Sequence, residues 1–264
     1  MDTFELAFAQ MLECFDIPQI PFLDCISLRC FGFHMGNAVK EWFRPAISVT
    51  QSIDRISEVT GLSISCTPVG SANPFLDKRG VMLGPLINHV AVQELRDYYY
   101  QGAENFLFCS IDDENLVEFF DPRGYVGLRL CKDQLRRILF EKTAFCISLK
   151  GKECTQTPPV NILEYGLSYH SKVREDECSQ MERAAQIYTY SREHTISLQY
   201  GVMNFLLQMD KVFILAQDCG WITDRAKEIY IKEKQALYTL SQSETIAELP
   251  YIVDRIWRIL EHGG

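Results

Sequence analysis

The sequence lacks any apolar run approaching the roughly 18 residues that a membrane-spanning helix needs. Asp2, Glu5 and Glu13 interrupt the N-terminal segment, and no basic stretch precedes an apolar one. We therefore expect neither a signal peptide nor a membrane partner. The ten cysteines contain no Cys-x-x-Cys pair, which argues against structural zinc. Most of them are expected to be small buried hydrophobes in a reducing compartment, so the predicted location is cytoplasmic.

Motifs for nucleotides and catalytic metals are also missing. The chain has no Gly-x-Gly-x-x-Gly, no phosphate loop and no His-Glu-x-x-His, so we expect no cofactor and no metal ligand. Its net charge of −9 disfavours a general nucleic-acid partner. None of these absences indicates the oligomeric state.

What the sequence does contain is typical of a globular α+β protein. The 264 residues are 47% apolar and 23% charged, enough for a sizeable core. Short β-rich runs alternate with Gly and Pro turns up to about residue 150. Strands are predicted at Phe106–Ile111, Leu116–Phe120 and 143–149, and helices at 132–140 and opening at Cys25 toward residue 37.

After a Pro-containing linker at residues 155–159, the apolar period changes to that of a helix. We predict an N-terminal domain over 1–154 and an all-helical domain over 160–264, with Pro250 in the first turn of the last helix. The three apolar stripes are Val202, Phe205, Leu206, Met209 and Phe213; Ala226, Ile229, Tyr230 and Leu237; and Ile246, Leu249, Val253, Ile256 and Leu260.

One spacing in the N-terminal part suggests thiol chemistry. Gln19 lies six residues before Cys25, and Asp121 follows a predicted strand pair that begins next to Asn105, sixteen residues earlier. A Gln can stabilise an oxyanion, a Cys can attack, and an Asp can orient a base. The base itself would occupy the position of Asn105, which is an amide.

Each of these residues also has a simpler interpretation. Cys25 could be one more core thiol; Cys30 competes with it but lacks a Gln at the matching distance. Asp121 could cap a turn, because Asp-Pro-x-Gly is common turn chemistry. His89 lies in the right region for a substitute base, although a lone His beside an apolar run is often a core or surface residue. His170 follows the linker and could fold back over the site.

In four short segments the chain resembles the butirosin biosynthesis protein H type of acyltransferase. The N-terminal domain of that family has a papain-like fold related to bacteriocin-processing double-glycine peptidases. The segments occur in the family's order within about residues 15–150; they are 24–25, 81–86, 102–106 and 121–125.

The resemblance implies a function and a set of roles. Cys25 would be the nucleophile, Asp121 the orienting acid and Gln19 the oxyanion donor, while the family's His falls on Asn105, which cannot accept a proton at neutral pH. The implied activity is acyl or aminoacyl transfer from a carrier-protein thioester to an amine, forming an amide in antibiotic-type, nonribosomal assembly. The implied partners are an acyl or peptidyl carrier protein, with the substrate on its phosphopantetheine, and an amine acceptor. By its place in the chain, His89 is the residue that we expect to substitute for this base.

A locally basic stretch fits such a partner. Residues 123–142 carry about +4 in this acidic chain, which could dock an acidic carrier or a phosphopantetheine phosphate, or could simply form a solvated helix face. The alternative function is a catalytically inactive homologue that acts as a binding or scaffold protein in a biosynthetic complex. A peptidase fits less well, because cleavage needs the leaving-group proton that a His would donate.

Overall fold

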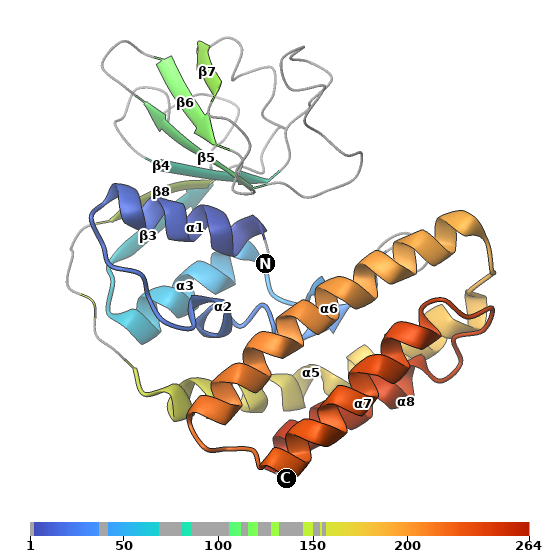
Figure 1. Ribbon diagram of the computed structural model, residues 1–264. Coiled ribbons are helices and arrows are strands. Elements are labelled where there is room, and N and C mark those ends of the chain that lie inside the picture. Colours follow the sequence, from blue (N-terminus) through green and yellow to red (C-terminus); the bar gives the residue numbers. More distant parts are fainter. Residues whose placement is uncertain are drawn as a thin grey trace. The chain divides into compact units, whose positions relative to one another are not determined.

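The chain divides into two units, each built from segments that are distant in sequence. The computed structural model (Figure 1) describes residues 3–36, 42–68, 81–85, 106–111, 116–120, 128–131, 145–149, 154 and 157–263. The first unit combines Met1–Pro21 with Thr60–Thr155, and the second combines Phe22–Val59 with Gln156–Gly264. The junction after Thr155 falls in the predicted linker. The segment Phe22–Val59 groups with the C-terminal helices, which the predicted division into 1–154 and 160–264 does not anticipate.

The first unit contains a six-stranded antiparallel sheet and a helix. The helix α1 (Thr3–Cys14) contacts β4 and β5. The sheet has the order β3-β8-β4-β5-β6-β7. Its strands are β3 (Ile64–Pro68), β4 (Val81–Pro85), β5 (Phe106–Ile111), β6 (Leu116–Phe120), β7 (Leu128–Cys131) and β8 (Phe145–Leu149).

The central hairpin of this sheet is the one predicted from the sequence. β5 and β6 have the predicted bounds, and they pair antiparallel with Phe108 opposite Phe120 and Ile111 opposite Val117. β8 confirms the strand predicted over 143–149. The helix predicted over 132–140 lies outside the described residues.

The second unit is mainly helical. Its long helices are α5 (Pro159–Ile187), α6 (Arg192–Asp218), α7 (Asp224–Leu240) and α8 (Leu249–Glu261). α5 contacts α6 and α8, and α7 contacts both α6 and α8 (Figure 1). The segment from Phe22 adds α2 (Leu23–Ile26), the two-stranded ribbon of β1 (Phe33–His34) and β2 (Arg44–Pro45), and α3 (Val49–Thr60).

The apolar stripes of α6 and α8 form the core of this unit, as predicted. All five predicted residues of each stripe are buried, with Ile246 lying just before α8 begins. On α7, Ala226, Tyr230 and Leu237 are buried but Ile229 is 41% exposed. Side-chain caps begin two of the helices: Ser191 accepts from the backbone N–H of His194, and Thr223 from that of Ala226. Pro250 stands in the first turn of α8.

The helix predicted to open at Cys25 and run toward residue 37 is wrong. α2 ends at Ile26, Leu28 takes a left-handed backbone conformation with φ 62°, and the chain enters β1. Tertiary packing overrides local propensity here. Phe31 packs near Trp257 with ring centroids 6.4 Å apart, and Phe33 meets Phe205 edge-on at 5.2 Å.

The protein is therefore α+β, and helices predominate among the described residues. None of the helices in these ranges combines the length and the apolar character needed to cross a bilayer.

Candidate functional site

Cys25 lies in a single turn of helix held between two strained residues. Phe22 precedes the turn with φ 56°, and Leu28 follows it with φ 62°. Bulky side chains rarely adopt this left-handed conformation, which costs roughly 1–3 kcal/mol per residue and occurs preferentially at functional sites. The turn is closed by backbone hydrogen bonds from Cys25 N to Phe22 O at 2.8 Å and from Leu28 N to Cys25 O at 3.1 Å.

Neighbouring side chains fix this turn to the helices of the second unit. The Asp24 carboxylate forms an ion pair with Lys211 of α6. The Asp24 carbonyl accepts hydrogen bonds from the Ser27 hydroxyl at 2.8 Å and from the Cys30 thiol at 3.4 Å. α2 also contacts α5 and α6. The backbone around Cys25 is thus held in place by tertiary contacts.

Both cysteines of this segment are free thiols and both are buried. Cys25 is 1% exposed and Cys30 is 0% exposed. A reagent that attacks Cys25 must therefore reach a sulfur that packing covers.

Of the remaining predicted site residues, Gln19 falls within the described part of the chain. Gln19 is exposed in the loop after α1 and belongs to the first unit, whereas Cys25 belongs to the second. Asp121, Asn105 and His89 lie outside the described residues, as does most of the basic stretch 123–142. Their roles stay predictions.

The strand ends next to two of these residues are nevertheless described. Phe106, which follows Asn105 in sequence, begins β5, and Phe120, which precedes Asp121, ends β6. Because the two strands are antiparallel, with Phe108 opposite Phe120, these two ends lie at the same end of the sheet.

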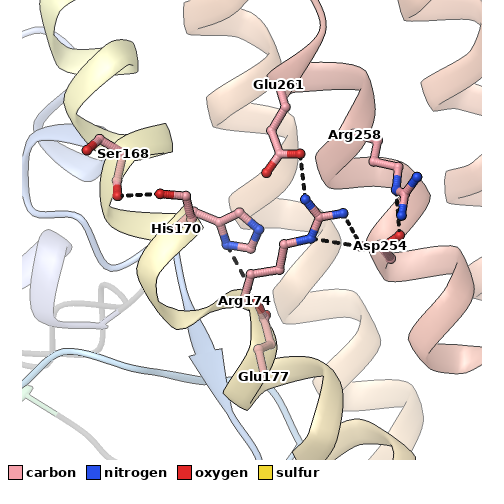
Figure 2. A network of polar contacts seen from close by, with 8 residues as sticks. Ser168, His170, Arg174, Glu177, Asp254, Arg258 and Glu261 are labelled. Carbon is pink, nitrogen blue, oxygen red and sulfur yellow. Dashed lines mark hydrogen bonds and ion pairs between the residues drawn. The ribbon is translucent and has the colours of Figure 1, made fainter.

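A second cluster of ionisable residues joins α5 to α8 (Figure 2). Arg174 donates from Nε to Asp254 Oδ1 at 2.9 Å and from Nη1 to Glu261 Oε2 at 2.7 Å. Arg258 donates to the other oxygen of Asp254 at 2.7 Å. The Arg174 guanidinium beside it holds the pKa of Asp254 below its usual value, although partial burial opposes this shift. This network fastens the two helices together through charge-assisted hydrogen bonds.

Beside this network, His170 and Glu177 are completely enclosed. His170 is 0% exposed and stacks on the Trp257 ring, with centroids 3.7 Å apart. Its Nδ1 lies 3.5 Å from Glu177 Oε2, and neither ring nitrogen has a hydrogen-bond partner among the described residues. The place of His170 just after the linker suggested that it could fold back over the site; the structure instead places it in the core of the helical unit.

Burial shifts the protonation of both members of this pair toward the neutral form. Loss of solvation, helped by the nearby charge of Arg174, lowers the pKa of His170 to about 3. Loss of solvation also raises the pKa of Glu177 to about 8, opposed only in part by the Phe33 backbone and Arg174. At neutral pH the core therefore holds an uncharged imidazole beside a largely protonated carboxyl group.

These residues were not predicted to form a cluster, although their spacing is visible in the sequence. His170, Arg174 and Glu177 follow one another at intervals of four and three residues, as do Asp254, Arg258 and Glu261. Such intervals place three side chains on one helical face. The sequence does not show that these faces of α5 and α8 pack against each other. No group of three His, Cys, Asp or Glu side chains arranged for a metal occurs within the described ranges.

Comparison with known proteins provides no family assignment. No protein-family model, curated protein or solved structure matches this chain.

Proposed function

We propose that the protein is a cysteine-dependent acyl or aminoacyl transferase that takes its acyl group from a carrier-protein thioester and forms an amide. The observation that carries this proposal is the strained turn around Cys25, bounded by Phe22 and Leu28 in left-handed conformations. Glycine or asparagine would adopt these conformations with less strain, so the bulky residues on both sides of Cys25 support a role for this turn.

The proposed reaction has two steps, acylation of Cys25 and transfer of the acyl group to the amine. The Cys25 sulfur attacks the thioester carbonyl, the bond to the phosphopantetheine sulfur breaks, and the released carrier thiol takes up the proton that Cys25 gave. The amine acceptor then attacks the acyl-Cys25 thioester, the amide forms, and the amine proton returns to the Cys25 sulfur. Gln19 and backbone N–H groups would stabilise the oxyanion in both steps.

The hairpin of the first unit supports a papain-like arrangement for the remaining roles. Asn105 and Asp121 are the sequence neighbours of two strand ends that lie at the same end of the sheet. In this proposal the two residues shape the site together, and His89 serves as the substitute base. A thioester is already activated, so this reaction depends less on the roughly 10²–10⁴-fold contribution of a well-placed base than peptide cleavage does.

Intact-protein mass spectrometry tests the proposal directly. Incubation of the full chain with a small acyl thioester should add one acyl mass. Cys25→Ser should abolish the addition, and Cys30→Ser, a matched change at a buried thiol five residues away, should retain it. Addition that persists in Cys25→Ser would contradict the proposed nucleophile.

A second candidate, a catalytically inactive scaffold protein, is favoured by two specific observations. Cys25 is 1% exposed, and an amide, Asn105, stands where a base is expected. An inactive homologue would show no acylation of the wild-type chain, yet it would bind its carrier protein equally well before and after Cys25→Ser. An enzyme would show acylation that depends on Cys25.

A further inference from the structure

The helix α6 is apolar on the side that faces solvent as well as on the side that faces the core. Its outer stripe repeats at intervals of four, three, four and seven residues, so its members share one helical face. The stripe consists of Ile196, Tyr200, Met203, Leu207 and Ile214, which are 43–68% exposed. A surface helix normally carries mainly polar residues on this face, whereas here large apolar side chains predominate and Asn204 is exposed beside them.

The neighbouring helix α7 extends the stripe into a groove. Ile231 is 53% exposed and Tyr238 is 46% exposed, and both line the groove between α6 and α7. Met203 and Leu207 line its other wall. The two helices lie beside one another in Figure 1. We call the seven exposed side chains of the stripe and groove the α6–α7 face.

The α6–α7 face has almost no uncompensated charge. No charged residue occurs in α6 between Glu193 and Asp210. Asp210, at the groove, accepts hydrogen bonds from Lys234 at 2.7 Å and from the Tyr230 hydroxyl at 2.7 Å. The charged lining of the groove, Asp210 and Lys234, is paired with itself and so offers little to a strongly acidic or basic partner, whereas two copies of a chain with net charge −9 can meet here without opposing like charges.

The size of the face matches what a dimer needs. With roughly 200 Å² for each large side chain, the exposed fractions amount to about 700 Å² of apolar surface. The largest apolar patch of a typical monomer is about 300–600 Å². A standard protein interface takes about 800 Å² from each partner.

We propose that a second copy of this chain covers the α6–α7 face in a two-fold symmetric dimer. A two-fold interface requires a patch that is complementary to itself. Here a ridge, the stripe on α6, lies directly beside a groove between α6 and α7, so a two-fold rotation can place the ridge of each copy in the groove of the other. This inference is independent of the acyl-transfer proposal, because it uses none of the residues assigned to that chemistry.

Sedimentation equilibrium of the full chain tests the dimer. The wild type should sediment at twice the mass of one chain at micromolar concentration. Tyr200→Glu and Leu207→Glu would each introduce one carboxylate per copy into the apolar interface, and each should raise the dissociation constant by roughly 30-fold or more. Tyr251→Glu is the matched control: Tyr251 is 61% exposed on α8, outside the face, and its substitution should leave the dimer intact.

Two results would overturn the proposal. One is a wild-type chain that stays monomeric at about 100 μM, and the other is a dimer that both substitutions on the α6–α7 face leave unchanged. Tryptophan fluorescence and circular dichroism of the variants separate loss of association from loss of folding. Protection of the Tyr200 and Leu207 side chains from hydroxyl-radical oxidation in a monomer would mean that another part of the same chain covers them, and it would likewise contradict the dimer.

Discussion

At the scale of single residues, His170 and Glu177 make the stability of the helical unit depend on pH in opposite directions. The pKa of Glu177 is raised in the folded state, so its stabilising effect is complete below about pH 4.5 and is lost as the pH rises through about 8. The pKa of His170 is lowered, so its effect is complete above about pH 6.5 and is lost as the pH falls toward 3. Between pH 4.5 and 6.5 the loss of stability from Glu177 and the gain from His170 cancel as the pH rises.

Glu177→Gln should therefore remove the alkaline slope. In the wild type, unfolding free energy from this site should fall by about 1.4 kcal/mol per pH unit between pH 6.5 and 8, whereas a buried amide does not titrate. All three tryptophans, Trp42, Trp221 and Trp257, belong to the second unit, so urea unfolding followed by tryptophan fluorescence reports this unit alone. Equal slopes in both proteins would show that Glu177 ionises in the folded state without cost.

At the scale of elements, helix α6 can approach the segment around Trp42 closely because Gly201 has no side chain. A Cβ atom at Gly201 would lie 2.2 Å from the Trp42 Cβ and 3.1 Å from the Trp42 carbonyl oxygen. Neither atom can rotate away, because both are fixed to the backbone.

Gly201→Ala should consequently destabilise the helical unit. Alanine improves helix propensity by about 1 kcal/mol. A contact at 2.2 Å, however, forces the two segments apart, and overpacking of this kind costs about 1–3 kcal/mol. We expect a lower urea midpoint by tryptophan fluorescence, with Asn204→Ala on the exposed side of the same helix unchanged or slightly more stable. An unchanged midpoint for Gly201→Ala would mean that the two segments can separate freely.

Some elements of the fold could be predicted from the sequence and others could not. β5 and β6 were predictable because two apolar runs flank a polar Asp-Asp-Glu-Asn turn, and the core stripes of α6 and α8 because one helical face is continuously apolar. The end of α2 was not, since it depends on the contacts that Phe31 and Phe33 make with Trp257 and Phe205. Long-range packing of this kind leaves no local pattern.

For the candidate site, the sequence supplies residue types and spacing but not the unit that each residue joins. Gln19 and Cys25 are six residues apart, yet the chain passes from one unit to the other at Pro21. The Cys25 turn is held by Lys211, almost two hundred residues further along the chain. Only tertiary structure relates positions so far apart.

At the scale of the whole molecule, the second unit is made from two separate segments of the chain. Phe22–Val59 supplies α2, β1 and β2, and Gln156–Gly264 supplies the long helices. The contacts between these segments include the Met35 N–H donating to Gln180 at 2.8 Å, the Thr157 hydroxyl donating to the Val59 carbonyl at 2.6 Å, and the Asp24–Lys211 ion pair. Phe31 and Phe33 also pack, buried, against Trp257 and Phe205 of the long helices, so the two segments should stay together without a covalent connection.

Cutting the linker should therefore leave the two pieces of the chain together. A protease site inserted after Gln156 would separate residues 1–156 from 157–264, and after cleavage the pieces should elute as one species on a native size-exclusion column and separate only in denaturant. The uncut insertion variant, with unchanged tryptophan fluorescence, controls for damage by the insertion itself. Two pieces that separate under native conditions would show that the long helices do not need Phe22–Val59. The predicted boundary near residue 154 would then divide two independent domains.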